Sequence, residues 1–517
     1  MQKQTFLRGA FTLMIAGMVT KLLGFVNKIV LARIVGEEGV GLYMMAYPTL
    51  LLVVTLTQLG LPVAISKLVA EASAYQDQKK IKRILIVSFT IVGTLSLLFT
   101  IALIVIAPLA SNILFTDERT LYPLLAITPI IPIVGIASVL RGYFQGMQNM
   151  KPYAFSQVIE QIVRISLVAT LANALLPYGI EYAAGGAMIA GVTGELISLL
   201  YMMWIFKRKK QITVRRQYWR YLNGGKQTLK ELMNIALPTT GSRLIGSFSY
   251  FLEPIVVAQS LYLAGVATTV ATKQYGELVG YAFPTLGLAG FITHALHVSL
   301  VPTISEAAAQ NKMSIIFYRV NQALKIALIA GGFSTIICFV FAEPIMELMY
   351  HSPQSAVYIY VVAPFFFLLY FQSPLAATLQ ALDLAKAAMI NSFIGAFAKI
   401  AIIFALASRP ELGIMGAALG FSSSIVLVTV LHFATVVKAI GFRLKYSFYI
   451  KGAISLAATG WFAKIATTYL FLDMSLLSRT LSLIGLVTVF YIIFIISIRL
   501  ITKDELAHFP IINKWVA

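Results

Sequence analysis

The stretch ILIVSFTIVGTLSLLFTIALIVIAP, residues 84–108, contains no charged side chain. The hydrocarbon core of a bilayer is about 30 Å thick, and an α-helix needs about 20 apolar residues to cross it. This stretch is therefore predicted to form one membrane-spanning helix. A helix is expected because backbone amides and carbonyls must pair with one another where no water is present.

Runs of the same kind recur along all 517 residues, of which 59% are hydrophobic and 12% are charged. Ordinary soluble domains are about 25% charged. The chain is therefore predicted to be an all-α integral membrane protein with about 14 transmembrane helices. The expected spans are residues 9–35, 40–66, 84–108, 121–143, 154–177, 183–206, 232–262, 278–305, 322–342, 355–381, 387–407, 413–437, 448–471 and 480–499. No small-residue cleavage site ends the first apolar stretch, so that stretch is interpreted as a permanent span and not as a signal peptide.

The net charge of +20 does not indicate a nucleic-acid partner, because the basic residues flank apolar segments and do not form one patch. They are interpreted as topology signals and contacts to anionic lipids. Most loop Lys and Arg residues fall at the two chain ends and in the even-numbered loops. Cytoplasmic loops are enriched in these residues, so both termini are predicted to lie on the cytoplasmic side of the cell membrane. The loops on the opposite side of the membrane are predicted to contain five basic residues, namely Arg33, Arg119, Lys273, Arg409 and Arg479.

An internal repeat predicts two similar six-helix lobes. Residues 145–165 read QGMQNMKPYAFSQVIEQIVRI, and residues 380–400 read QALDLAKAAMINSFIGAFAKI, so that Arg164 aligns with Lys399. Six helices per repeat give both lobes the same orientation, as in one class of transporters. The expected domains are an N-lobe (1–206), a basic cytoplasmic linker (207–230), a C-lobe (231–437) and a two-helix extension with a cytoplasmic tail (438–517).

Several cations fall within or at the ends of the predicted spans, where ionisable groups usually mark a pathway or a paired interior site. The first predicted span contains Lys21 and Lys28 and ends at Arg33, and the seventh contains Arg243. Lys21 and Lys28 are two helical turns apart and therefore share a face. No acidic residue precedes Glu37 in the chain. These cations are predicted to face a hydrated cavity that binds an anionic substrate, although snorkelling to an interface is an alternative for those near span ends.

Other charged residues are candidates either for interior ion pairs or for a coupling-ion site. Glu160 and Arg164 are four residues apart, in the order that favours a helical ion pair. Glu195 is expected to make a helix-packing contact or to bind a coupling ion. Glu253 precedes a proline that could free backbone carbonyls for a cation, with packing as the alternative. Lys399 is the repeat counterpart of Arg164.

Motifs of catalysis are absent from the sequence. It contains no G-x-x-x-x-G-K-[ST] loop and no nucleophile elbow, and its five histidines do not have the spacing of a metal motif. A single cysteine, Cys338, excludes an internal disulfide. The chain is therefore not expected to be an enzyme or to hold a metal or cofactor, and transport would be driven by ion gradients, membrane potential or the gradient of the substrate.

Four stretches carry a resemblance to a known family. They are LLGFVNKIVLARIVGEEGVGLYMMAYP (22–48), QLGLPVAISKLVAEAS (58–73), LRGYFQGMQNMKP (140–152) and LPTTGSRLIGSFSYFLEPIVVAQSL (237–261). The sequence resembles the polysaccharide-transporter branch of the multidrug/oligosaccharidyl-lipid/polysaccharide (MOP) exporter superfamily, which is related to lipid II flippases. The resemblance runs from end to end and is strongest to members that act in sporulation.

The resemblance implies a flippase that moves an undecaprenyl-pyrophosphate-linked saccharide across the cytoplasmic membrane by alternating access, here for spore cortex peptidoglycan. Lys21 and Arg33 match places where lipid II flippases of the family line their cavity with basic residues. Asn27 departs from the pattern, because those flippases commonly carry another cation there. Spans 448–471 and 480–499 would correspond to the helices that form a groove for the lipid tail.

Two other functions remain alternatives from the sequence. One is a cation/drug antiporter of the same superfamily, which would need a cavity lined by carboxylates. The other is a membrane scaffold that recruits cell-wall enzymes and transports nothing. The expected partners are a lipid-linked anionic saccharide, membrane lipids and cell-wall synthesis enzymes, with no nucleic acid.

Overall fold

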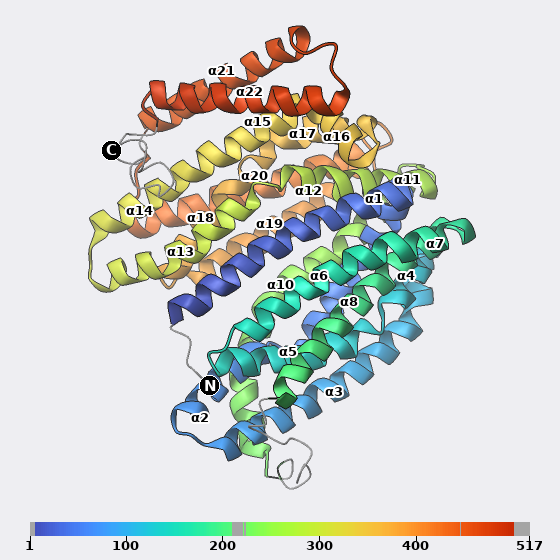
Figure 1. Cartoon of the computed structure of the whole chain (residues 1–517), viewed down its shortest axis with the longest axis vertical. Helices are drawn as coiled ribbons and strands as arrows, with labels where there is room; N and C mark the ends of the chain where they lie inside the picture. Colours follow the sequence, from blue (N-terminus) through green and yellow to red (C-terminus); the bar gives the residue numbers. More distant parts are fainter. Residues whose placement is uncertain (1–5, 209–220, 222–223, 445, 501–517) are drawn as a thin grey trace. The chain divides into compact units, whose positions relative to one another are not determined.

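The computed structural model describes residues 6–208, 221, 224–444 and 446–500, and these residues form helices joined by turns without a β-strand (Figure 1). The contacts between them divide the chain into two compact units. The first unit is Met1–Tyr281 with Ile400–Ala417, and the second is Ala282–Lys399 with Ala418–Ala517. The expected all-α membrane fold is thus confirmed for the described residues.

The first unit begins with α1 (Phe6–Gln58), which contains two helices joined at Gly36. Gly36 has φ 66° and ψ −171°, a conformation that a residue with a Cβ atom rarely adopts. The predicted span 9–35 corresponds to the first arm, before this glycine, whereas the predicted span 40–66 covers the second arm and runs on past the end of α1 at Gln58. Gly60, with φ 62°, separates α1 from α2 (Leu61–Ala74).

Small residues let the remaining helices of the first unit pack closely. A Cβ atom on Gly142 would lie 2.8 Å from the Pro62 carbonyl oxygen, and one on Gly146 would lie 2.7 Å from the Ser66 carbonyl oxygen. Close approach of backbones through glycine is the usual way in which membrane helices pack. The other elements of this unit are α3 (Gln78–Leu109), η1 (Ala110–Leu114), η2 (Glu118–Thr120), α4 (Leu121–Ile127), α5 (Ile130–Gly146), α6 (Lys151–Leu167), η3 (Val168–Ala172), α7 (Asn173–Leu175), η4 (Leu176–Tyr178), α8 (Ile180–Arg208), α10 (Lys226–Leu263), α11 (Thr268–Tyr275) and η5 (Gly276–Ala282), which ends at the unit boundary.

The second unit contains the C-terminal helix pair, which packs through aromatic side chains. The rings of Phe462 and Phe490 stack with their centroids 4.1 Å apart, and the Tyr491 hydroxyl donates a hydrogen bond to the Ile329 carbonyl oxygen at 3.0 Å. The elements of this unit are α12 (Phe283–Leu286), α13 (Gly290–Ala309), α14 (Met313–Ile326), η6 (Ala327–Gly331), α15 (Gly332–Val340), α16 (Ala342–Tyr350), η7 (Pro353–Ser355), α17 (Ala356–Phe366), α18 (Leu369–Ala381), α21 (Tyr446–Tyr469) and α22 (Leu476–Ser497), together with most of α19 (Ala385–Ala407) and α20 (Ile414–Ile440).

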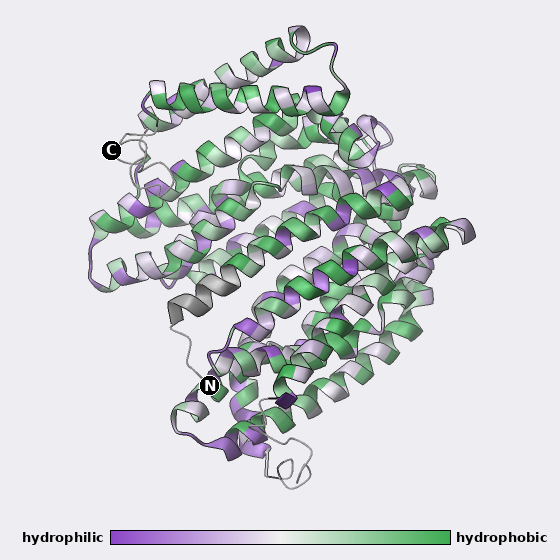
Figure 2. Ribbon diagram, viewed as in Figure 1, coloured by the Kyte–Doolittle hydropathy of each residue, from purple (hydrophilic) through white to green (hydrophobic). Residues whose placement is uncertain are grey.

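Apolar residues occur along the helices of both units (Figure 2), and many of their large side chains are exposed. Val105 and Trp461, for example, are each 71% exposed. Large exposed apolar surfaces are rare on soluble monomers, so these side chains are interpreted as facing lipid. By length and composition, 11 helices of the described chain could cross a membrane, or 12 if one bent pair counts as a span.

The total of about 14 spans stays a prediction. One of the 11 candidates, Ile15–Ala74, contains two of the predicted spans, and α21 is not among the candidates although it is a helix of 24 residues. The lobe boundaries at 206, 230 and 437 also stay predictions. The division by contacts is a different one, because it places α10 and α11 in the first unit. Residues 209–220 and 222–223 of the expected linker lie outside the described residues.

Candidate functional site

The cations expected in the cavity differ in their exposure. Lys21 and Arg33 on α1 and Arg243 on α10 are exposed, whereas Lys28 is half-buried. Within the described chain, no ion pair or hydrogen bond involves the side chain of Lys21, Lys28 or Arg243. Arg33 does interact with another group. The two of these that are exposed, Lys21 on α1 and Arg243 on α10, are thus left available to an anion.

Helices α1 and α10 pack directly against each other in the first unit. The hydroxyls of Thr55 and Ser247 form a hydrogen bond at 2.9 Å, and a Cβ atom on Gly60 would lie 2.3 Å from the Thr239 hydroxyl. Ser247 also donates a hydrogen bond to the backbone carbonyl of Arg243 at 3.0 Å. Arg243 therefore begins the helical turn through which α10 contacts the second arm of α1.

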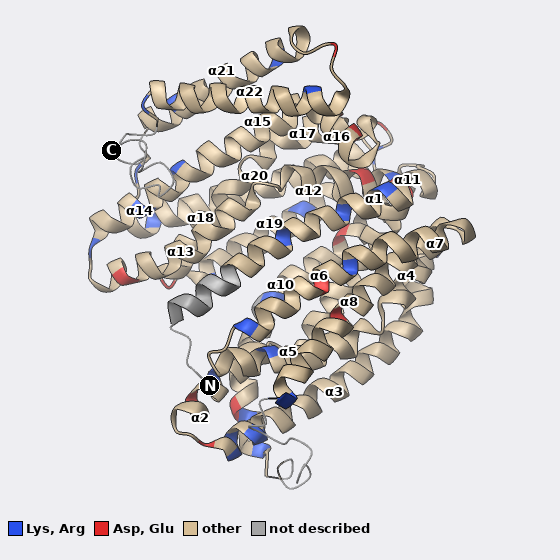
Figure 3. Ribbon diagram, in the orientation of Figure 1, with Lys and Arg blue, Asp and Glu red and all other residues tan. Residues whose placement is uncertain are grey.

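A second group of charges lies inside the first unit and is electrically neutral (Figure 3). Arg164 and Glu160 form an ion pair along α6, and Arg141 on α5 forms another with Glu195 on α8. Each arginine lies close enough to both carboxylates to interact with them electrostatically. A Cβ atom on Gly194 would lie 2.9 Å from the Glu160 carbonyl oxygen, so a glycine on α8 allows this close packing.

Arg141 is the member of this group that the sequence reasoning missed. Its guanidinium also lies 5.5 Å from the centre of the Tyr153 ring, within reach of a cation–π contact. The sequence could have indicated Arg141, because the stretch LRGYFQGMQNMKP places this arginine near the end of a predicted span. Glu195 is thus paired with Arg141, and its role as a packing contact or a coupling-ion site stays a prediction.

The other two predicted residues lie apart from this group. Glu253 is buried on α10 and makes interactions of its own. Lys399 lies on α19 with its ammonium 5.5 Å from the centre of the Phe421 ring. The repeat explains the difference from Arg164, because the residue that aligns with Glu160 is Gly395 and offers no carboxylate one turn away. Whether any of the charged residues predicted as site residues acts in transport remains a prediction.

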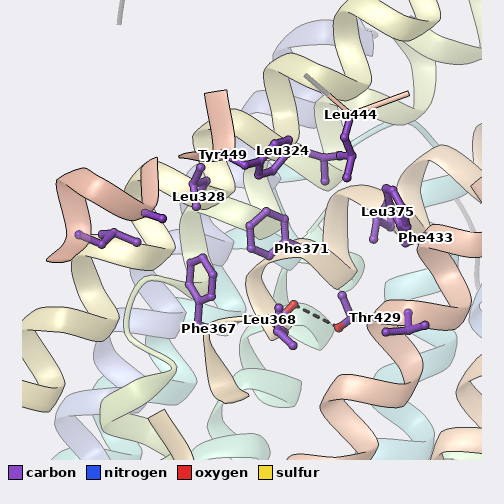
Figure 4. Close-up of a pocket in the computed structure, with 13 residues that line it drawn as sticks. Leu324, Leu328, Phe367, Leu368, Phe371, Leu375, Thr429, Phe433, Leu444 and Tyr449 are labelled. Atoms are coloured by element: carbon purple, nitrogen blue, oxygen red, sulfur yellow. Dashed lines mark hydrogen bonds between the residues drawn. The ribbon is translucent and has the colours of Figure 1, made fainter. Parts of the chain in front are cut away.

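An apolar cavity of about 440 Å³ opens in the second unit. Residues of α14, η6, α18, α20 and α21 line it, including Leu324, Phe371 and Ala453 (Figure 4). Among its lining residues only Thr429 and Tyr449 carry a polar side-chain atom. The Thr429 hydroxyl hydrogen-bonds to the Ile425 carbonyl oxygen at 2.7 Å, within its own helix. The cavity therefore suits a hydrocarbon chain.

The described residues contain no group of three or more His, Cys, Asp or Glu side chains placed to hold a metal ion. The first unit presents exposed cations on two packed helices. The second unit, taken by itself, contains an apolar cavity.

Comparisons with known proteins agree with the resemblance in the sequence. Residues 6–308 match the family model described as Polysaccharide biosynthesis protein, and residues 254–405 match the MatE model. The chain is 55% identical over 516 residues, 100% of both chains, to Stage V sporulation protein B of Bacillus subtilis (strain 168). It is 24% identical over 442 residues, 81% of each chain, to the Lipid II flippase MurJ of the same organism.

Solved structures show the same fold. A lipid II flippase MurJ in an inward closed conformation matches with a TM-score of 0.68 at 16% identity, covering 94% of this chain and 98% of that chain. An inward-facing multidrug resistance MATE family transporter of the MOP superfamily matches with a TM-score of 0.65 at 15% identity, covering 82% of this chain and 94% of that chain. The MOP transporter fold is thus shown.

Proposed function

The chain belongs to the polysaccharide biosynthesis protein family and is a multi-pass membrane transporter of the MOP superfamily, and from that premise we propose its substrate. The substrate is a lipid-linked anionic saccharide, of the kind in which a polyprenyl pyrophosphate carries a peptidoglycan precursor. The protein flips this lipid outward across the cytoplasmic membrane. By analogy with its sporulation relative, the product serves spore cortex synthesis.

The observation that carries the proposal is the pair of exposed, unpartnered cations on α1 and α10. Lys21 and Arg243 lie on membrane helices, within the part of the chain that the structure describes, without a carboxylate partner. Lone charges at membrane depth are costly, and they are kept where they serve a hydrated pathway. A pyrophosphate supplies the opposite charge, and its bonds to cations are among the strong ones.

The headgroup and the tail need different surroundings during the flip. The pyrophosphate and sugars occupy the hydrated side of α1 and α10, while the polyprenyl chain stays in lipid or enters the apolar cavity. Rocking of the two lobes then exposes the headgroup to the other side of the membrane, as in other repeat-built transporters. No ATP site is required by this scheme.

The cation/drug antiporter is not favoured. A cationic drug would need free carboxylates in the cavity, whereas Glu160 and Glu195 are each paired with an arginine. The exposed charges of α1 and α10 have the wrong sign for such a substrate.

The apolar cavity gives a prediction about the lipid tail. Ala453→Trp fills the cavity mouth, because Ala453 is an exposed residue of its lining. We expect the flipping rate of a lipid with a full-length polyprenyl tail to fall about tenfold, the effect of removing about two CH₂ groups from an apolar site. The measurement is flipping in proteoliposomes of paired substrates that differ only in tail length.

The matched control for this prediction is Ala457→Trp, one turn further along the same helix and outside the cavity lining. It should leave both rates unchanged. A short-tailed analogue should be flipped equally fast by wild type and by Ala453→Trp. An equal loss for the short and the long tail would show that the cavity does not hold the tail.

A further inference from the structure

The two ion pairs inside the first unit also bring two acids together. Glu160 on α6 is paired with Arg164 of the same helix, one turn further along. Glu195 on α8 is paired with Arg141 of α5. The carboxyl groups of Glu160 and Glu195 lie within hydrogen-bonding reach of each other. A hydrogen bond between two carboxyl groups needs a proton on one of them, because two carboxylates that share a site repel each other.

Each arginine holds its carboxylate through one side of the guanidinium group. The hydrogen bonds are donated by the Nη2 atoms of Arg141 and Arg164. The Nε–H groups of both arginines are buried without an acceptor among the described residues. An arginine that makes two parallel hydrogen bonds to a carboxylate stabilises the ionised form more strongly than one that makes a single bond. The two arginines therefore position the acids and leave room for a proton between them.

A proton suits this position better than a metal ion. Ca²⁺ and Mg²⁺ take about six or more oxygen ligands, whereas both acids already share their oxygens with guanidinium groups. The positive guanidinium groups also repel a metal cation. Water has access to the edge of the cluster, because the side chains of Glu160 and Arg164 are 12% exposed and 19% exposed.

The other titratable groups around the two ion pairs, within the described chain, are tyrosines. Tyr153 of α6 lies beside Arg141, and Tyr43 and Tyr47 of α1 lie close enough to Arg164 to interact with it electrostatically. Tyrosines are uncharged near neutral pH. The cluster is thus neutral when both glutamates are ionised, and it carries one positive charge when one proton is bound.

The second repeat has the corresponding helices without the acids. By the alignment of the repeat, Gly395 on α19 takes the place of Glu160, and α18, α19 and α20 contain no acidic residue. These helices still pack closely, because the Gln372 amide on α18 donates to the Ile425 carbonyl oxygen on α20 at 2.9 Å. Helices of this repeat therefore pack without a charged cluster, which indicates that the cluster of the first unit has a role beyond packing.

We propose that Glu160 and Glu195 form a proton-binding site, in which the two carboxyl groups share one proton and the two arginines hold them in place. Binding adds one proton and one positive charge to the first unit and breaks no covalent bond. The existence of the site does not depend on a substrate. Its role in transport rests on the proposed function.

The site lies next to the helix that bears Lys21. A Cβ atom on Gly24, one turn beyond Lys21, would lie 3.7 Å from the side-chain oxygen of Gln161, which follows Glu160 on α6. A positive charge gained beside α1 favours an anion bound at the exposed cation of α1. Because linkage between two ligands is reciprocal, the proton strengthens binding of the anionic lipid, and the lipid strengthens binding of the proton.

Infrared difference spectroscopy of the purified protein in lipid detects the shared proton. Ordinary carboxyl groups are ionised at about pH 7, so the C=O band of a protonated carboxyl group at that pH marks a proton that the fold retains. We expect this band in wild type, with a height that falls as the pH is raised. Glu160→Gln and Glu195→Gln should each abolish it, because the remaining acid then lies beside two arginines and no second acid.

Two further variants decide the assignment of the band. Glu231→Gln is the matched control, because Glu231 is also paired with a cation, Lys80 at 3.3 Å, and it should leave the band unchanged. Glu160→Asp keeps an acid and should shift the band, which tests the assignment even if a Gln variant does not fold. A wild type without the band at about pH 7 would overturn the site. A band that Glu160→Gln, Glu195→Gln and Glu160→Asp all leave intact would overturn it as well.

The role in transport is tested by the affinity of the protein in lipid nanodiscs for fluorescent lipid II. Wild type should bind it about tenfold more tightly at about pH 6 than at about pH 8, a coupling of ordinary size. Glu160→Gln/Glu195→Gln should bind it equally at both pH values. Binding by wild type that does not change with pH would overturn the link to the substrate. If wild type binds no lipid II at either pH, the proposed function fails, while the infrared band still decides whether the proton site exists.

Discussion

Lys21→Ala combined with Arg243→Ala is expected to lower the rate of lipid II flipping about a hundredfold or more. Each substitution removes a hydrogen bond between a cation and the pyrophosphate, and a hydrogen bond to a charged group contributes about 1.5–3 kcal/mol. The measurement is the rate at which fluorescent lipid II crosses the membrane of proteoliposomes that contain the variant.

Two control variants separate charge from general damage. Lys21→Arg with Arg243→Lys keeps both charges and should retain most of the activity. Lys312→Ala with Arg319→Ala removes one lysine and one arginine from exposed positions in and just before α14 and should have no effect. Normal flipping by the Lys21→Ala/Arg243→Ala variant at equal protein content would eliminate these cations from the mechanism.

Arg141→Met is expected to destabilise the protein by about 3–5 kcal/mol. Arg141 is 18% exposed and Glu195 is 5% exposed, so the substitution leaves an uncompensated carboxylate inside the first unit. Glu195→Met should have a similar cost, because it leaves the arginine unpaired. The measurement is the midpoint of unfolding in mixed micelles of detergent and denaturing surfactant.

The double variant Arg141→Met/Glu195→Met tests the pairing directly. It should lie within about 1 kcal/mol of wild type, since replacing both members of a buried pair by apolar residues is often neutral. The matched control, Lys80→Met/Glu231→Met, removes a pair that is 35% and 31% exposed and should cost about 1 kcal/mol at most. Additive losses in Arg141→Met/Glu195→Met would mean that the two side chains act independently.

Features that depend on local spacing were predictable from the sequence. The apolar run at 84–108 lies within α3, and the four-residue spacing of Glu160 and Arg164 corresponds to an ion pair on one helix. Both follow from the geometry of a single helix, in which length and periodicity are fixed. The family could also be recognised from the sequence, because the four stretches that resemble it are long.

Features that depend on how helices pack could not be predicted in the same way. Arg141 and Glu195 lie on different helices, and only the packing of α5 near α8 brings them together. The exposure of Lys28 also depends on packing, because this residue shares a helix face with Lys21 but is half-buried, whereas Lys21 is exposed. A Cβ atom on Gly41 would lie 2.0 Å from the Thr272 carbonyl oxygen, so the second predicted span also meets the segment just before the eighth, and a glycine in the sequence does not by itself identify such a partner.

The most direct test of the central claim is the flipping of lipid II by the wild-type protein alone in liposomes. The account predicts that purified protein makes inner-leaflet fluorescent lipid II accessible to an external reagent. It also predicts that a neutral polyprenyl-linked sugar without pyrophosphate stays where it is. Equal flipping of both lipids, or flipping of neither by correctly inserted protein, would contradict recognition of an anionic lipid-linked saccharide by the cations of α1 and α10.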